Sequence, residues 1–293
     1  MRKNILTAAV SAVMAFSMLG AVPTFAEPSE IYTDTMIRIE SESFLQKSAA
    51  EPMLPYQYDD LSTQAQKCYI DIRKAIIAHK NSVKISSRIS EKTLLTIADI
   101  LKNQDPLTFG GADIEYNGIS TDNAYARLTY SYTKGVDDSI EKQVAKEADK
   151  VIAAFVPDAD EYGKFLAIHD HITATAENDE ADPKAFSRTV YGALIIGKST
   201  SDGYACAFQY ISIKAGLTSI VVSGTGADGS AHTWNKVKIG ENWYNVDCFA
   251  DDNGSCYDKF MVSDDTMKQF YTENSGGDNP AANDDSLAQK IAE

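Results

Sequence analysis

The sequence has few cysteines and an excess of acidic over basic residues. The four cysteines form no Cys-x-x-Cys pair, and their spacing is not that of a zinc site. Lys and Arg number 27 against 42 Asp and Glu, which gives a net charge of −15. Nucleic acids and anionic membranes attract clustered Lys and Arg, and no such cluster is present. We therefore expect no nucleic-acid partner, no metal and no other cofactor.

Long apolar runs are also missing, except at the start of the chain. Arg2 and Lys3 precede an apolar stretch over residues 5–19, and Ala26 closes a small-residue cleavage site. The stretch is shorter than the ~20 residues that a membrane-spanning helix needs. The pattern predicts a signal peptide over residues 1–26 and a secreted, extracellular or cell-surface protein with no membrane partner after cleavage. An uncleaved anchor is the alternative.

Export would permit disulfide bonds among the cysteines. Cys248 and Cys256 are close enough in sequence to close a short loop. Cys68 and Cys206 fit equally well as small buried apolar residues. The sequence does not decide the pairing.

The rest of the chain divides by composition and periodicity. We expect a polar leader over residues 27–57, a helical and β-hairpin region over 58–160, a core over 161–272 and a disordered acidic tail over 273–293. Helical spacing covers residues 61–80, 90–102, 137–155 and 161–175, and strand-like alternation covers 114–116 and 124–132.

The last segment predicts one helix followed by an antiparallel sheet. Residues 204–215 have a helical pattern that ends at Gly216, a residue type suited to the position after a helix. Strand-like runs follow at 219–223, 232–239 and 243–246, and residues 240–242 form a tight turn between the last two.

Three motifs lie in this segment: Ser-Asp-Gly-Tyr-Ala-Cys-Ala-Phe from Ser201, Ala-His-Thr-Trp-Asn from Ala231, and Trp-Tyr-Asn-Val-Asp from Trp243. In this order and spacing the sequence resembles the bacterial transglutaminase-like family, relatives of the papain-type cysteine proteases. That family has Cys-x-Gly-Tyr-Ala-x-Ala-Phe, His-Ala-Trp-Asn and Trp-Tyr-x-Val-Asp. The resemblance covers roughly residues 58–270. It implies an α+β fold with a papain- or transglutaminase-like core, in which the nucleophile helix packs on an antiparallel sheet.

The resemblance implies that His232 is the general base and that Asp247 orients it. The strands joined by the turn at 240–242 would place the two side chains side by side, where a carboxylate holds the imidazole tautomer and stabilises its charged form. The nucleophile position departs from the family. Counting back from Gly203 and from Gly216 both lead to Ser201, whereas Cys206 lies about 140° further round the helix.

Serine at this position changes the chemistry. A helix N-terminus and a neighbouring imidazolium lower a cysteine pKa from ~8.5 towards ~3.5–7.5. A hydroxyl does not ionise in this way and would need concerted deprotonation by His232. We expect a catalytically degenerate protein that binds a peptide, a protein or a cell-wall polymer in the inherited cleft. The alternative is an active peptidase, amidase or acyltransferase that uses Ser201, His232 and Asp247.

Weaker candidates have plain structural alternatives. Tyr191 could contribute to an oxyanion hole with the Ser201 N–H, or be a core tyrosine, and Trp234 could line a substrate groove or pack the sheet. His169 and His171 would point about 200° apart on a helix, so we expect one in the core and one in water. The pairs at 251–252 and 264–265 could bind calcium, with solvated charge the simpler expectation.

Overall fold

The computed structural model describes residues 53–85, 89–105, 112–117, 125–130, 134–184, 186–252, 257–274 and 279–291. The expected signal peptide and Cys256 lie outside these ranges, as does nearly all of the polar leader. None of the helices within these ranges is long and apolar enough to cross a membrane.

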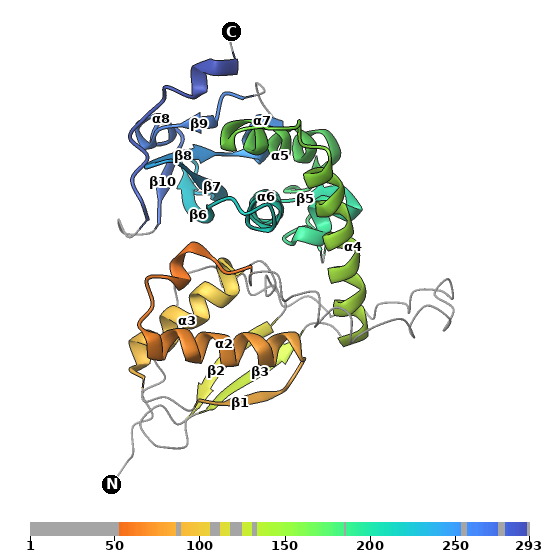
Figure 1. Ribbon diagram of the computed structural model, residues 1–293, viewed down its shortest axis with the longest axis vertical. Helices are drawn as coiled ribbons and strands as arrows, with labels where there is room; N and C mark the ends of the chain where they lie inside the picture. Colours follow the sequence, from red (N-terminus) through yellow and green to blue (C-terminus); the bar gives the residue numbers. More distant parts are fainter. Residues whose placement is uncertain are drawn as a thin grey trace, which may run out of the picture. The chain divides into compact units, whose positions relative to one another are not determined.

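The first part of the described chain combines helices with a small antiparallel sheet (Figure 1). The sheet has the order β1-β3-β2 and a continuous antiparallel register between β2 and β3. Apolar residues at helical spacing on α2 and α3 are buried together with Ala126 and Leu128 of β3. Its elements are η1 (Tyr56–Tyr58), α2 (Thr63–Ile77), β1 (Ser82–Lys84), α3 (Glu91–Asn103), β2 (Ala112–Asn117) and β3 (Tyr125–Tyr130).

Helix caps account for several of the predicted boundaries. The Ser90 side chain accepts a hydrogen bond from the Thr93 N–H at the start of α3, and Asp160 does the same for Gly163 at the start of α5. Such caps satisfy backbone donors that the first turn of a helix leaves free. The predicted helices at 90–102 and 161–175 are therefore confirmed.

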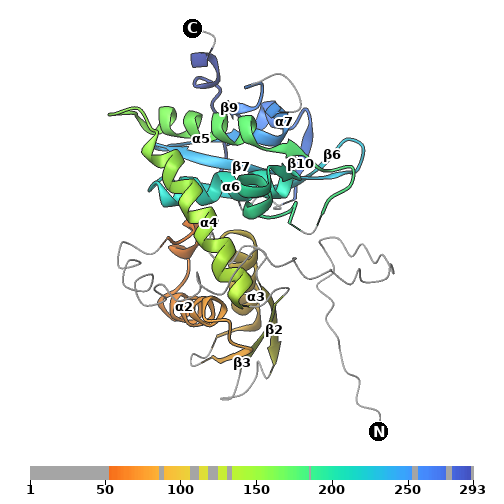
Figure 2. The ribbon, with the colours of Figure 1, turned by 90° about the vertical axis from the view of Figure 1, so that its right-hand side faces the viewer.

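The second part of the chain is built on a five-stranded antiparallel sheet with the order β10-β6-β7-β8-β9. Helix α6 packs along β6 and β7 (Figures 1 and 2). The predicted α+β class is confirmed. The elements are α4 (Lys134–Ala153), α5 (Glu161–Thr175), β4 (Glu177–Asn178), η2 (Gly192–Ile196), β5 (Lys198–Ser199), α6 (Ser201–Lys214), β6 (Ser219–Gly226), β7 (Ala231–Ile239), β8 (Asn242–Val246), α7 (Cys248–Asp252), β9 (Phe260–Val262), α8 (Asp264–Met267), β10 (Tyr271–Glu273) and η3 (Ala288–Ile291).

Both faces of the sheet are covered. On one face, β7 and β8 contribute Val237 and Val246 to a core shared with α4, α5 and α6. On the other face, Trp234 and Trp243 pack with Met267 and other apolar residues. The alternation of side chains along β7 separates these two sets, as expected for a strand buried on both sides.

Two boundaries differ from the sequence-based expectation. Val144, Ala148 and Val151 of α4 are buried in the same core as α6, so this helix packs with the segment assigned to residues 161–272. In the tail, for which disorder was expected, Ala282 is 1% exposed, and Asp285 accepts hydrogen bonds from the backbone and the hydroxyl of Ser263. The acidic composition of the tail gave no sign of these specific acceptors.

Candidate functional site

Ser201 is the first residue of α6. The preceding residue, Thr200, has an extended backbone and the helix begins directly after it. The Ser201 side chain is therefore placed where the unpaired N–H groups of a helix create a positive field. Ser201 is only 3% exposed.

The neighbour of Ser201 is a carboxylate. Oε1 of Glu180 accepts hydrogen bonds from both the backbone N–H and the hydroxyl of Ser201, at 3.0 Å and 2.9 Å. Glu180 itself lies at the surface. The sequence gives no sign of this contact, because Glu180 lies 21 positions before Ser201 and belongs to no motif.

His232 of β7 and Asp247, directly after β8, are hydrogen-bonded to each other. Nε2 of His232 lies 2.7 Å from Oδ2 of Asp247, and both side chains are buried. The other oxygen of Asp247 accepts the Ala250 N–H at 3.0 Å, which fixes the carboxylate at the end of β8. Asp247 thus occupies Nε2 and leaves Nδ1 as the nitrogen that could act on a nucleophile.

Aromatic rings hold the imidazole in place. Tyr271 of β10 stacks on His232 with ring centroids 4.2 Å apart and an interplanar angle of 16°. The ring centroid of Phe249 lies 5.6 Å from that of His232 and 5.4 Å from that of Tyr204 of α6, so its ring packs near both. Tyr271 and Phe249 belong to none of the quoted motifs, so the sequence does not single them out.

The start of β7 is tied to the start of α6. The Thr233 hydroxyl donates to Asp202 at 2.6 Å, and Arg188 donates to the other oxygen of Asp202 at 2.7 Å. Further along, the buried amide of Asn235 donates to the carbonyl of Ala205 at 3.1 Å. The Asn of the second motif therefore links strand and helix.

Ser201 and the His232–Asp247 pair are nevertheless not joined. Within the part of the chain that the structure describes, no hydrogen bond connects the Ser201 hydroxyl to the His232 imidazole. The hydroxyl is bonded to Glu180 instead. The Ser201 hydroxyl therefore cannot transfer its proton directly to His232 in this conformation.

Gly203 shows why the motif needs a glycine after Ser201. A Cβ at this position would lie 2.6 Å from the carbonyl oxygen of Ser187 and would also collide with the Ser199 side chain. The first turn of α6 therefore packs against the 187–199 segment at backbone distance. A larger residue would force the helix away from the loop that carries Glu180.

The three cysteines within the described ranges have the surroundings of inert buried thiols. Burial raises the pKa of the Cys206 thiol well above its ordinary value, and the Asp202 charge adds to the rise. Cys248 is a free buried thiol, and Cys256, the partner considered for a disulfide bond, lies outside the described residues. Because a thiolate is the reactive form, a buried thiol with a raised pKa is inert.

Tyr191 and Trp234 have the surroundings of structural residues. The Tyr191 ring packs edge-on against Phe186 at 5.1 Å. Trp234 is 2% exposed and donates its indole N–H to Asn245 at 2.9 Å. The surroundings of both residues therefore match the structural alternatives.

His169 and His171 diverge as the helical geometry predicts. His169 is fully buried, with Nε2 3.1 Å from Asp251, whereas His171 is partly exposed beside Glu147. The expectation of solvated charge at residues 251–252 is wrong for Asp251, because this carboxylate is buried against His169. Among the described residues, no group of three or more His, Cys, Asp or Glu side chains could hold a metal ion.

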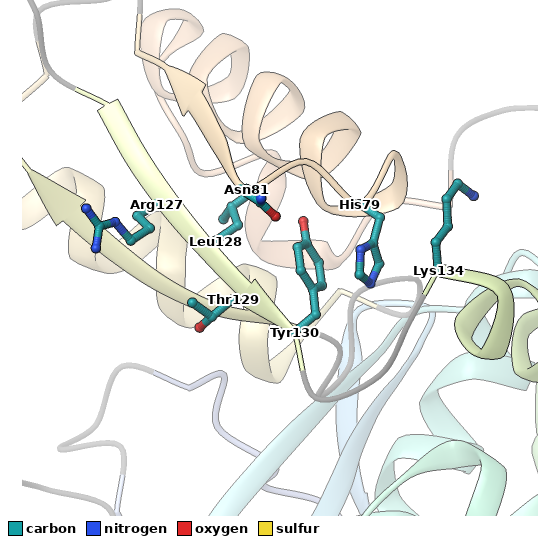
Figure 3. Close-up of a pocket in the computed structure, with 7 residues that line it drawn as sticks. All are labelled: His79, Asn81, Arg127, Leu128, Thr129, Tyr130 and Lys134. Atoms are coloured by element: carbon teal, nitrogen blue, oxygen red, sulfur yellow. The ribbon is translucent and has the colours of Figure 1, made fainter. Parts of the chain in front are cut away.

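A separate hollow of about 680 Å³ lies at the end of α2, along β3 and at the start of α4 (Figure 3). His79 stacks on Tyr130 there and lies 2.9 Å from Asp137, while Lys134 is paired with Asp138. Its lining includes neither Ser201 nor the His232–Asp247 pair. It is therefore distinct from the candidate site.

The comparisons agree with this arrangement. Residues 149–248 match the model of the Transglutaminase-like superfamily, which confirms the resemblance for the segment that carries Ser201, His232 and Asp247. This segment is therefore similar to that superfamily. No curated protein matches the sequence at a significant level.

Several solved structures are similar at a distance. The crystal structure of a TGase is 15% identical, with a TM-score of 0.37, over 69% of this chain and 60% of that one. A proposed cysteine protease from Cytophaga hutchinsonii is 14% identical, with a TM-score of 0.34, over 55% and 65%. The periplasmic domain of TgpA from Pseudomonas aeruginosa bound to ethylmercury is 17% identical, with a TM-score of 0.31, over 43% and 55%. The chain spans less than two thirds of each structure, and TM-scores below 0.5 carry over no activity.

Proposed function

We propose that this chain is an exported, catalytically silent transglutaminase-like protein that binds a peptide or a cell-surface polymer in its cleft. The observation that carries the proposal is the hydrogen bonding of Ser201, whose hydroxyl donates to Glu180 and not to His232. A serine needs a base in contact with its hydroxyl to attack an acyl group. His232 is instead hydrogen-bonded to Asp247, whose other oxygen accepts the Ala250 N–H.

The preserved parts support binding. Asp247 and the stacked Tyr271 ring hold His232 in place on the sheet. The hydrogen bond from Thr233 to Asp202 ties β7 to the start of α6. A peptide has carbonyl acceptors and N–H donors that suit the polar groups of Ser201, Glu180 and His232. Export would bring the protein to peptides and polymers outside the cytoplasm.

Turnover assays test the proposal. Hydrolysis of fluorescent casein and incorporation of dansylcadaverine into casein would be measured for the unaltered protein and for Ser201→Ala. We expect both proteins to stay at the background rate. Turnover by the unaltered protein that disappears in Ser201→Ala would overturn the proposal.

Binding is tested separately. Fluorescence polarisation with labelled casein peptides and co-sedimentation with purified peptidoglycan would distinguish a peptide ligand from a cell-wall ligand. The proposal expects saturable binding in at least one assay. Absence of binding in both would contradict the binding role.

A further inference from the structure

Glu180 is brought to Ser201 by a short parallel strand pair. Strand β4 pairs with β5 in the register Glu177 with Lys198 and Asn178 with Ser199. Two more residues along each segment lead to Glu180 on one side and to Ser201 on the other. The contact therefore follows from the register of the backbone.

The loop that carries Glu180 is anchored on both sides. The Asp179 N–H donates to the Ser199 carbonyl at 2.8 Å, and the Glu180 N–H donates to the Asn178 side chain at 2.8 Å. At the other end of the loop, the Thr200 N–H donates to the Ser187 carbonyl at 2.9 Å. These bonds hold the Glu180 carboxylate against the beginning of α6.

The Glu180 carboxylate takes two donors at once. In acyl-transfer sites, backbone N–H groups at the nucleophile stabilise the oxygen of the reacting carbonyl. Here Oε1 of Glu180 accepts hydrogen bonds from both the backbone N–H and the hydroxyl of Ser201. The carboxylate therefore stands where the carbonyl oxygen of a bound peptide would be received.

We infer that Glu180 is a built-in plug of the inherited cleft, which a ligand must displace by offering an acceptor oxygen of its own. The inference rests on the proposed function, because it concerns the regulation of the same site. It also implies two obstacles to a charged nucleophile at position 201. The residue is a serine, whose hydroxyl ionises far less readily than a thiol, and the negative charge of Glu180 lies beside it. A carboxylate next to a thiol disfavours the thiolate and raises the pKa of the thiol.

The test places a cysteine at position 201, with the Glu180 carboxylate either present or removed. Three full-length variants are compared: Ser201→Cys, Ser201→Cys with Glu180→Gln, and Ser201→Cys with Asp182→Asn. Asp182 is a matched control, since it lies on the same loop with its side chain 81% exposed and is paired with Lys184. The rate of iodoacetamide alkylation at position 201, followed from pH 4 to pH 10 by peptide mass spectrometry, gives the thiol pKa.

We expect the Glu180→Gln change to lower the thiol pKa by at least one unit, a tenfold gain in thiolate at any pH well below the pKa. The Asp182→Asn control should leave it unchanged. An equal thiol pKa in Ser201→Cys and in its Glu180→Gln derivative would overturn the inference that Glu180 blocks the site. If both values were low, the inherited cleft of the proposed function would stand without a plug. If both pKa values were near ~8.5, the value of an ordinary thiol, the proposed function would be contradicted as well, because the site would not have kept the geometry that activates a thiol.

Discussion

Oδ2 of Asp247 lies 2.7 Å from Nε2 of His232, while its Oδ1 accepts the N–H of Ala250. The carboxylate thus joins the end of β8 to the start of β7, and it is 1% exposed. The pair is complete although the residue at the nucleophile position is a serine bonded elsewhere. Because both side chains are buried, their hydrogen bond also stabilises the fold.

The Asp247 carboxylate should therefore contribute to stability. Asp247→Ala leaves the buried His232 imidazole and the Ala250 N–H without their acceptor, and breaking a buried pair costs ~3–5 kcal/mol. Urea denaturation should show a loss of unfolding free energy of about this size. Asp265→Ala is the control, because the Asp265 side chain is 91% exposed and should change stability little. A loss below ~1 kcal/mol for Asp247→Ala would contradict the structural role.

Gly203 should not tolerate a side chain. Gly203→Ala puts a Cβ 2.6 Å from the Ser187 carbonyl oxygen, and overpacking of this kind costs ~1–3 kcal/mol. Thermal unfolding should show a lower Tm. Gly135→Ala is the matched control, because nothing lies within 4 Å of the added Cβ on α4. Equal Tm values for the two variants would show that the α6 turn is not packed as described.

His169 should make stability depend on pH. Burial alone lowers the pKa of His169, but hydrogen bonds with Asp170 and Asp251 and the charges of both carboxylates outweigh burial, and the pKa is raised above 6.5. The charged imidazole thus stabilises the fold fully below pH 6.5, and this contribution is lost as pH rises through the raised pKa. Urea denaturation of the unaltered protein and His169→Gln should therefore differ more at pH 6 than at pH 9. A difference that grows with pH would contradict the assignment.

The described cysteines should be unreactive in the folded protein. Burial, followed by the nearby Asp71 charge, raises the pKa of Cys68 to about 11, and burial raises the pKa of Cys206 and Cys248 well above the ordinary value. Iodoacetamide at pH 7.5 should leave the peptides that contain these residues unmodified. The same peptides should react fully in urea. Rapid modification of Cys206 in the folded protein would indicate a different nucleophile.

The sequence carried enough information for the central elements. Polar caps and apolar spacing located the helices that begin after Ser90 and Asp160. The family resemblance singled out His232 and Asp247, and the turn at residues 240–242 allowed the two side chains to lie side by side. Local physical rules are sufficient for the helices, whereas the histidine–aspartate pair depended on the resemblance.

The partners of Glu180 and Asp251 could be recognised only in the folded structure. Glu180 reaches Ser201 through β4 and β5, which are two residues long and show no periodicity. Asp251 is buried because α5 brings His169 to it across 82 positions of sequence. Both carboxylates look like ordinary solvated charge in the sequence, and only long-range packing gives them partners.

The state of Ser201 is tested most directly by a fluorophosphonate probe, which modifies only a serine that a base activates. The unaltered protein and Ser201→Ala would be incubated with the probe and examined by intact-protein and peptide mass spectrometry, with a known serine hydrolase as the positive control. Our account predicts no adduct on Ser201, because its hydroxyl is bonded to Glu180 and not to His232. A stoichiometric adduct on Ser201 that is absent from Ser201→Ala would contradict the account and would identify an active serine enzyme.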